Sequence, residues 1–208
     1  MIEESNRKAI DKVSSYLFCT ELGAVQNLKN ENIHKNVYFV GNTMIDTLVE
    51  NLDKIKYYNY KSEIANKYNI VLKRNFYIIC TLHRQSNVDN PKIIDYILRI
   101  IDDISINYRV IIPLHPRTAK NINKRKYKNI IFVEPLSYIK FLSLIYDSKC
   151  VITDSGGIQE ETSFLNKQCI TLRRNTERPI TIIKGTNRLC SIDYEEIMVN
   201  ILRYKEKE

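Results

Sequence analysis

The sequence contains no tryptophan and little glycine or proline, with five of each among 208 residues. Collagen-like and low-complexity proteins are rich in glycine and proline, so both classes are excluded. No apolar run approaches the roughly 20 residues that a membrane-spanning helix needs. The hydrophobic content of 44% is that of an ordinary globular chain. The length predicts one large domain, or one domain with part of another.

Cysteine is also scarce, and the five residues show no metal-ligand spacing: Cys19, Cys80, Cys150, Cys169 and Cys190. Their number is odd, and four of them lie in or beside apolar runs that are typical of strands. These features predict buried, reduced thiols. The first residues of the sequence also lack the pattern of a secretory leader, in which basic residues are followed by an apolar segment. We therefore expect a cytoplasmic protein that uses no metal ion and no cofactor.

The charge is one-sided, with 32 Lys and Arg against 24 Asp and Glu and a net charge of +8. The densest basic run is residues 117–128, RTAKNINKRKYK. One interpretation of such a run is nucleic-acid binding. However, the run has a single aromatic residue, Tyr127, and no nucleic-acid motif, which favours a solvated helix face. We expect neither a nucleic-acid partner nor a membrane partner.

Short apolar runs rich in β-branched residues alternate with helical patterns along most of the chain. The runs lie at residues 37–40, 76–81, 109–114, 130–133, 150–152 and 169–172. Strands that alternate with helices predict an α/β fold with a parallel sheet covered by helices on both faces. We expect this sheet to extend from about Val37 to Leu172, which is the end of the last clear strand.

The most informative segment is residues 150–161, CVITDSGGIQEE. Its apolar start predicts a buried strand, Ser155, Gly156 and Gly157 predict a tight turn, and a helix follows. Backbone N–H groups at a helix N-terminus favour an anion, and adjacent glycines allow a phosphate to approach the backbone closely. Glu160 and Glu161, one turn later, could accept hydrogen bonds from sugar hydroxyls. The alternative is an ordinary strand-turn-helix connection with favourable turn residues.

Polar residues also follow other predicted strands. His83 and Arg84 come after residues 76–81, and His115 comes after residues 109–114. Because the carboxyl ends of parallel strands meet at one edge, where ligands bind, we expect these side chains to lie beside the glycine turn. Arg173 and Arg178 lie near a carboxylate, Glu177, in the sequence, and each is at least as compatible with a structural ion pair as with a ligand contact.

Seven motifs occur in order: VGNTMID at 40–46, TLHR at 81–84, PLHP at 113–116, TDSGGIQEE at 153–161, LR at 172–173, TERP at 176–179 and GTN at 185–187. Together with Glu3-Glu4-x-Asn6-Arg7, they resemble the non-hydrolysing UDP-N-acetylglucosamine 2-epimerases over nearly the whole chain. The resemblance implies two Rossmann-like domains in a GT-B arrangement. Residues 1–40 would be a remnant of the first domain and residues 41–208 the second, UDP-binding domain, shortened at its end. The pattern departs from the family at Ser86, Thr118, Ile180 and Ser191.

The family reaction inverts C2 of the sugar, interconverting UDP-N-acetylglucosamine and UDP-N-acetylmannosamine. A base removes the C2 proton while UDP leaves C1, and UDP then adds back to the glycal. The resemblance implies roles for nine residues: His83 and Glu3 in catalysis; Ser155, Gly156 and Gly157 on the diphosphate; Glu161 on the ribose; Arg178 on UDP; and Arg84 and His115 at a regulatory UDP-sugar site.

Three hypotheses follow for the function. The first is an epimerase whose missing half comes from a companion chain or an upstream reading frame, with a homodimer also open. The second is a non-catalytic remnant that binds UDP or a UDP-sugar. The third is a GT-B glycosyltransferase domain, against which the TERP motif argues.

Overall fold

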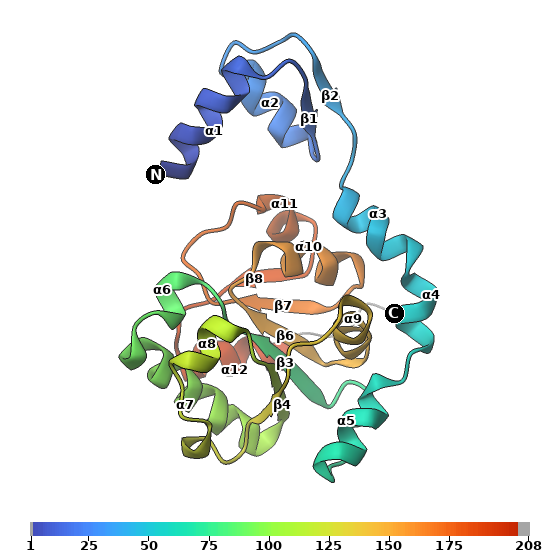
Figure 1. Ribbon diagram of the computed structural model, residues 1–208, viewed down its shortest axis with the longest axis vertical. Helices are drawn as coiled ribbons and strands as arrows, with labels where there is room; N and C mark the ends of the chain where they lie inside the picture. Colours follow the sequence, from blue (N-terminus) through green and yellow to red (C-terminus); the bar gives the residue numbers. More distant parts are fainter. Residues whose placement is uncertain (1, 204–208) are drawn as a thin grey trace. The chain divides into compact units, whose positions relative to one another are not determined.

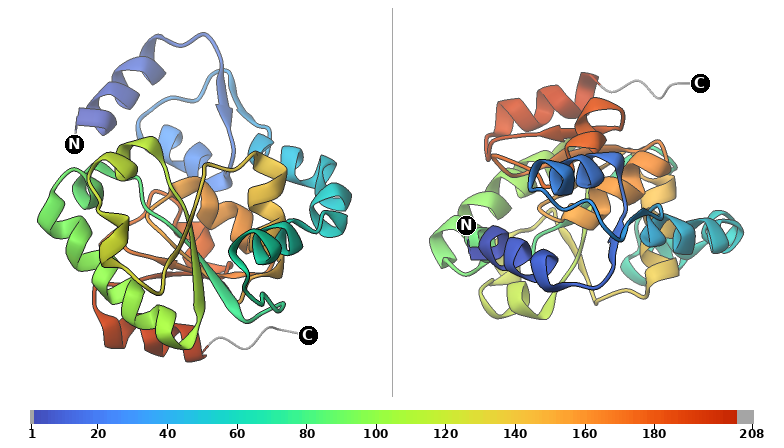
Figure 2. Two further views of the ribbon diagram at one scale, coloured as in Figure 1. Left: turned by 60° about the horizontal axis from the view of Figure 1, so that its bottom comes forward. Right: turned by 90° about the horizontal axis from the view of Figure 1, so that it is seen from above.

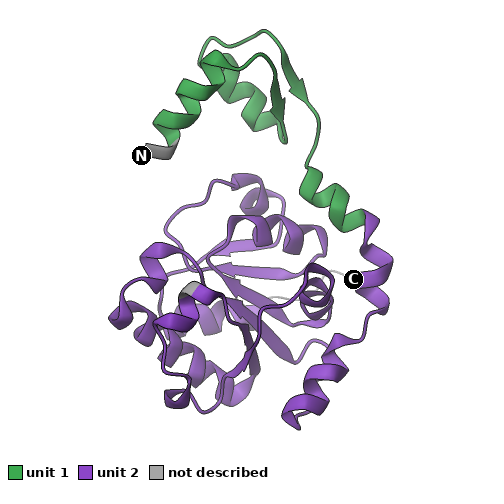
Figure 3. Ribbon diagram, viewed as in Figure 1, with its two compact units in different colours: residues 1–49 green, residues 50–208 purple. Residues whose placement is uncertain are grey.

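The computed structural model describes residues 2–203, and the chain forms two compact units (Figure 3). The first unit extends to Val49 and the second begins at Glu50. Each unit has its own sheet, so each is described by itself. Among the described residues, no helix is both long and apolar enough to cross a membrane.

The first unit is built around a two-stranded parallel sheet. Its elements are α1 (Ile2–Val13), β1 (Leu17–Cys19), α2 (Leu22–Asn30), β2 (Val37–Phe39) and most of α3 (Thr43–Glu50). Leu17 and Cys19 of β1 pack with Leu28 of α2 in a small core. The prediction that the main sheet starts near Val37 is therefore wrong, because Val37 pairs with Leu17. Helix α2 joins β1 to β2 over a short distance, and such local pairing costs less loop-closure entropy than pairing with a distant strand.

The second unit contains the main sheet, which has six parallel strands. They are β3 (Tyr77–Thr81), β4 (Arg109–Pro113), β5 (Ile131–Val133), β6 (Cys150–Thr153), β7 (Gln168–Thr171) and β8 (Asn187–Leu189). Their order is β5-β4-β3-β6-β7-β8, the order of a doubly wound α/β fold. The parallel sheet is thus confirmed. Strand β8 was not predicted, because two of its three residues, Asn187 and Arg188, are polar and no apolar run marks it.

The helices of the second unit are α4 (Leu52–Tyr57), α5 (Tyr60–Tyr68), α6 (Gln85–Val88), α7 (Pro91–Asn107), α8 (Pro116–Lys120), α9 (Tyr138–Asp147), α10 (Gly156–Phe164), α11 (Pro179–Ile183) and α12 (Tyr194–Arg203), with a 3-10 turn η1 at Lys124–Lys126 (Figure 1). Helices α7 and α12 contact each other and pack on one face of the sheet. Helices α9, α10 and α11 lie on the opposite face (Figure 2). Both faces are covered, as predicted.

Helix α7 shows how local sequence and the core agree. The Asn90 side chain caps the helix by accepting a hydrogen bond from Lys92 N, and Pro91 takes the first position, where no N–H is needed. Ile97 and Ile101 of its apolar stripe join Ile78 of β3 in the main core. On the other face, the buried Tyr77 hydroxyl donates to the Leu144 carbonyl of α9 at 2.7 Å. The central strands are therefore buried on both sides, which explains their continuous apolar runs.

The basic run does not form a single helix. It divides between α8 and η1, and Lys124, Arg125 and Lys126 are exposed. Tyr127, its one aromatic residue, is buried, and its hydroxyl donates to Asp95 at 2.7 Å. An aromatic side chain held in this way is not available for stacking on a base.

Candidate functional site

The centre of the main sheet is a topological switch point. Strands β3 and β6 are neighbours, but the chain leaves β3 toward β4 and leaves β6 toward β7. The connections therefore diverge at the carboxyl ends of these two strands, which is where ligands bind in open α/β sheets. The two ends are joined by a 2.7 Å hydrogen bond between the hydroxyls of Thr81 and Thr153.

Asp154, the first residue after β6, organises the loop that follows β3. Its carboxylate accepts hydrogen bonds from the backbone N–H groups of His83 and Arg84, at 3.0 to 3.2 Å, and from Asn87 Nδ2 at 3.1 Å. Nδ1 of His83 lies 2.9 Å from Asp154 Oδ1. The Asp154 side chain has no solvent exposure, whereas that of His83 is 44% exposed. The imidazole is thus held at Nδ1, and part of the ring is exposed at the carboxyl edge of the sheet.

The electrostatics of Asp154 favour its charged form. Burial acts to raise the pKa of this carboxyl, but the hydrogen bonds from the His83 ring and from the backbone of Arg84 and His83 outweigh it. The pKa therefore lies below its ordinary value, and Asp154 is a carboxylate near neutral pH. Sequence reasoning treated Asp154 as a turn residue only. No sequence signal distinguishes a turn aspartate from one that holds a histidine.

The predicted anion site forms the start of α10. Ser155 is the N-cap residue in an extended conformation, and its side chain makes no capping hydrogen bond. No acidic residue lies in the first turn, so no side chain of that turn offsets the positive end of the helix dipole. The first N–H groups of any α-helix lack partners within the helix. With Gly156 and Gly157 at the first two positions, this end of α10 has the chemistry of a phosphate site.

The TERP segment closes over this turn. A Cβ atom at Gly156 would lie 2.9 Å from Glu177 Oε1, which is closer than real Cβ contacts allow. Glu177 is held by Arg173, whose two terminal nitrogens lie 2.5 and 3.2 Å from its carboxylate oxygens. The structural ion pair considered for Arg173 is thus present. Only a residue without a side chain fits at Gly156 while Glu177 keeps this position.

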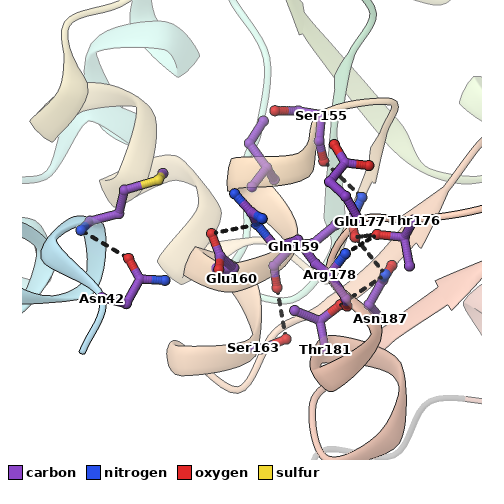
Figure 4. A network of polar contacts seen from close by, with 12 residues as sticks. Asn42, Ser155, Gln159, Glu160, Ser163, Thr176, Glu177, Arg178, Thr181 and Asn187 are labelled. Carbon is purple, nitrogen blue, oxygen red and sulfur yellow. Dashed lines mark hydrogen bonds and ion pairs between the residues drawn. The ribbon is translucent and has the colours of Figure 1, made fainter. Parts of the chain in front are cut away.

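Gln159 is the hub of a buried polar network that sequence reasoning missed (Figure 4). The fully buried side chain donates to the Ser155 carbonyl at 3.1 Å. Its Oε1 atom accepts from Thr176 Oγ1 at 2.6 Å and from Asn187 Nδ2 at 3.0 Å. One amide therefore ties the helix N-terminus, the TERP segment and β8 together. Its place in the TDSGGIQEE motif was the only available signal.

Glu161 and Arg178, both predicted to contact UDP, interact with other side chains of the protein. Glu161 is 6% exposed, and its pKa is raised by burial and by the nearby charge of Glu160, against a hydrogen bond with Tyr138 that lowers it. Burial, and then the charge of Glu161, raises the pKa of Tyr138 to about 12. Arg178 Nε lies 3.2 Å from Glu160 Oε2. Glu160, for which sugar hydroxyls were predicted, therefore has an arginine partner.

The remaining predicted residues divide into two groups. The rings of His83 and His115 have centroids 6.1 Å apart, and both residues line a hollow of about 190 Å³ with Leu136, Phe141 and others. Arg84 lines a larger groove of about 860 Å³ together with Arg173. The two histidines and Arg84 thus border the carboxyl edge of the sheet, as predicted.

Glu3 belongs to the first unit. Its backbone lies in α1, and its side chain is outside the described part of the structure. Its predicted role therefore stays a prediction.

A doubly wound parallel sheet with a glycine turn at its switch point defines a Rossmann-type domain. The family described as UDP-N-acetylglucosamine 2-epimerase matches residues 1–208 in sequence. The chain belongs to this family.

Known relatives support the assignment. A UDP-N-acetylglucosamine 2-epimerase of Methanococcus maripaludis is 39% identical over 208 residues, which cover 95% of this chain and 56% of the relative. A UDP-2,3-diacetamido-2,3-dideoxy-D-glucuronate 2-epimerase of Pseudomonas aeruginosa is 34% identical, with 91% and 52% covered. The chain thus spans a little over half the length of the relatives it matches.

Solved structures agree on the fold. The Methanocaldococcus jannaschii UDP-GlcNAc 2-epimerase in complex with UDP-GlcNAc and UDP matches with a TM-score of 0.82 and 35% identity, over 100% of this chain and 59% of that one. The wall teichoic acid polymerase TagF, at 13% identity and a TM-score of 0.54, shares the fold alone. The fold is the predicted Rossmann-like sheet of a GT-B-type protein.

Proposed function

We propose that this chain is the UDP-holding part of a UDP-N-acetylglucosamine 2-epimerase, which interconverts UDP-N-acetylglucosamine and UDP-N-acetylmannosamine. One observation carries the proposal. His83, anchored on the buried Asp154, and the Ser155-Gly156-Gly157 turn share the switch point of one sheet. A group that exchanges protons thus lies at the same edge as a site for a leaving diphosphate.

The reaction needs UDP to be held both as a leaving group and as a nucleophile. The turn at Ser155, Gly156 and Gly157 binds the diphosphate through fixed backbone donors, which do not reorganise as charge develops on the leaving phosphate. His83 keeps Nδ1 on Asp154, so Nε2 is the ring atom that we assign to proton transfer near the leaving phosphate. Asp154 is a positioning residue in this scheme, since it acts through His83.

The other residues have supporting roles in the proposal. Glu161 accepts hydrogen bonds from the ribose, and Arg178 contributes to UDP binding in exchange for its contact with Glu160. Arg84 and His115 belong to a regulatory UDP-sugar site on the same edge. Glu3 is the second catalytic group.

Turnover requires more than the described residues offer. Abstraction of a sugar C2 proton needs acid and base groups on both sides of the sugar, held at reaction distance. The relatives that carry the activity in their names are almost twice as long. We therefore assign turnover to this chain together with the remaining part of such an enzyme. A UDP-binding protein without turnover is the second candidate, and the Ser155-Gly156-Gly157 turn supports it equally.

A cytoplasmic location is supported by five buried free thiols.

Calorimetric titration of the chain with UDP tests the binding step, with ADP as the matched control nucleotide. We expect weak, saturable binding of UDP that is lost in Gly156→Asp, because a carboxylate at this position would repel the phosphate. Equal UDP affinity in the variant would reject the site, and equal heats for UDP and ADP would reject a preference for the uracil base.

A further inference from the structure

The first residues of the six parallel strands lie along one edge of the main sheet, which we call the amino edge. Each strand has a lysine or an arginine as its first residue or within the three residues before it. In spatial order these residues are Lys128 (β5), Arg109 (β4), Arg74 (β3), Lys149 (β6), Lys167 (β7) and Lys184 (β8). The Ser155-Gly156-Gly157 turn lies at the other ends of the strands, so the amino edge is a separate surface.

Few negative charges balance these cations. The Asp147 carboxylate, at the end of α9, already contacts Lys61 at 2.7 Å and Arg74 at 3.4 Å. Asp102 of α7 accepts a backbone hydrogen bond at 2.8 Å, and only the neighbouring Asp103 is exposed. The exposed cations of this edge that take part in no ion pair among the described residues are Lys73, Arg109 and Lys128. The amino edge therefore keeps an excess of positive charge.

Three large apolar side chains are exposed at the same edge. Phe76, directly before β3, is 66% exposed, and Ile106, in the last turn of α7, is 69% exposed. Leu202, in the last turn of α12, is 64% exposed. The end of α12 belongs to this edge because the side chain of Gln168, the first residue of β7, donates to the Asn200 carbonyl at 2.7 Å. Single exposed apolar side chains are common, but these three come from separate elements and share one basic edge.

Helix dipoles account for part of the basic character. Helices α7, α9 and α10 end at the amino edge, and the negative end of a helix dipole favours Lys and Arg nearby. The dipoles give no reason for the exposure of Phe76, Ile106 and Leu202. Exposed apolar groups among cations are the chemistry of peripheral binding to an anionic lipid surface, where the apolar groups enter the boundary of headgroups and acyl chains and the cations meet phosphates.

Other partners fit this edge less well. A second copy of the chain that presented the same edge would bring like charges together, which opposes association. A single-stranded nucleic acid needs aromatic rings on which its bases stack. Phe76 is an exposed ring, but Tyr108 and Tyr146 are engaged by Lys149 and Arg74, whose charged groups lie 5.7 and 5.1 Å from the ring centroids.

We propose that the amino edge binds peripherally to an anionic lipid surface. Its unpaired cations meet the lipid phosphates, and Phe76, Ile106 and Leu202 enter the boundary of headgroups and acyl chains. The residues of this surface are spread over positions 73–202 of the sequence, which is why no single segment predicted a membrane partner. Because the carboxyl edge lies at the other ends of the strands, the proposed UDP site stays open while the chain is bound. The inference does not depend on the proposed function.

Vesicle sedimentation tests the proposal, with vesicles of equal parts phosphatidylglycerol and phosphatidylcholine compared with phosphatidylcholine alone. We expect residues 1–208 to bind the anionic vesicles only, and to be released as added salt screens the charges. The double variant Lys73→Gln/Arg109→Gln should bind at least about tenfold more weakly, since each cation near such a surface contributes about fivefold. Lys92→Gln/Lys120→Gln is the matched control, because it removes two exposed charges from helices that begin at the carboxyl edge.

Phe76→Ser tests the apolar contribution. It should weaken binding about fivefold and leave the dependence on salt unchanged, because it removes apolar area and no charge. Tyr96→Ser is the control, at a 54% exposed position in the first half of α7, and should bind like wild type. Thermal unfolding verifies that each variant is folded.

Four results would overturn the proposal: wild type does not bind the anionic vesicles; it binds the neutral vesicles equally well; the two double variants bind equally well; or Phe76→Ser binds like wild type. Single-stranded oligothymidine is the competing polyanion. If it binds more tightly than the vesicles and depends on Lys73 and Arg109, the edge belongs to a nucleic acid and the lipid assignment is rejected.

Discussion

His83 Nδ1 and Asp154 Oδ1 lie 2.9 Å apart, and they join the ends of the two central strands of the main sheet. The carboxylate that makes this contact is buried and also accepts backbone hydrogen bonds from the loop after β3. The same group therefore shapes the loop, orients the imidazole and begins the turn toward Ser155. The shape of the loop and the orientation of the imidazole thus depend on one side chain.

Replacing Asp154 by asparagine should lower the free energy of unfolding by about 1.5–3 kcal/mol, the cost of disturbing hydrogen bonds to a charged group. The new amide NH2 group would face N–H donors that now donate to a carboxylate oxygen, so these donors would lose their acceptor. Urea denaturation measures the change. The control is Asp103→Asn, at an exposed position on α7, which should stay within about 0.5 kcal/mol of wild type. An equally small effect at Asp154 would contradict the assigned role.

The pH dependence of stability should reveal the same carboxylate. Its pKa is lower in the folded than in the unfolded state, so its stabilisation is complete above the unfolded value of about 3.9 and is lost as pH falls through the folded pKa. The difference between wild type and Asp154→Asn should therefore narrow as pH falls below about pH 4. A difference that persists unchanged to pH 2 would show that another group is responsible.

Gly156→Ala should weaken UDP binding by about tenfold, or 1.4 kcal/mol. The added methyl group meets Glu177 Oε1 and crowds the phosphate position. The double variant Gly156→Ala/Glu177→Ala separates the two effects, since it relieves the first and keeps the second. If the phosphate is crowded by the methyl group itself, the double variant should bind UDP as weakly as Gly156→Ala. Gly23→Ala is the matched control, because no atom lies within 4 Å of a Cβ there.

Glu161→Gln should weaken UDP binding by about 1.5–3 kcal/mol at pH 7 if the carboxylate accepts ribose hydroxyls. Burial raises the pKa of Glu161, so in wild type the affinity should begin to fall at a higher pH than for an exposed glutamate. The variant should lack this component of the pH profile.

A carboxyl with a raised folded-state pKa opposes folding above that pKa, so Glu161→Gln should also be more stable than wild type at pH 7. Calorimetry from pH 5 to 8 and urea denaturation provide both readouts, and Glu195→Gln, exposed on α12, is the control.

Gln159→Leu should destabilise the second unit by about 1–3 kcal/mol for each polar group left without a partner. The Thr176 hydroxyl loses its acceptor, and the Asn187 amide keeps only one of its two acceptors, Thr181 Oγ1 at 3.2 Å. Hydrogen exchange should increase in the TERP segment and in β8 but not in β3 or β4. Uniformly faster exchange would indicate global loss of stability and would reject the local role. Gln26→Leu, on the exposed surface of α2, is the control.

Residues 1–208 alone should not epimerise UDP-N-acetylglucosamine at an appreciable rate. Half of the sugar's surroundings is supplied by other residues in this proposal, and acid–base catalysis depends on groups held in place there. The measurement is NMR of the sugar C1 proton, with exchange of the C2 proton in deuterated water as the more sensitive signal. Addition of the part of a relative that lies outside its match to this chain should restore exchange, and His83→Ala should abolish it again. Rapid epimerisation by the chain alone would show that the chemistry was assigned to the wrong residues.

The interior of the main sheet was predictable from local sequence. Strands β3, β4, β6 and β7 are buried on both faces, so each appears as a continuous apolar run between helical patterns. The turn after β6 was predictable for the same local reason, since adjacent glycines and a serine at a strand end have few alternative conformations. The edges were not. Strand β8 has a polar sequence, and it is a strand because Cys169 and Thr171 of β7 present a neighbouring edge to it.

The sequence by itself determined the class of fold and the sheet edge at which the polar motifs gather, because hydrophobic periodicity and turn chemistry act over a few residues. Tertiary structure alone decided which strands pair and which polar side chains meet. It paired the backbone of Val37 with that of Leu17 rather than with the main sheet. It also brought Asp154 into contact with His83 and set Gln159 between Thr176 and Asn187. These contacts join residues that are 17 to 71 positions apart. Their energy comes from satisfying polar groups inside a folded core, and no local pattern records that requirement.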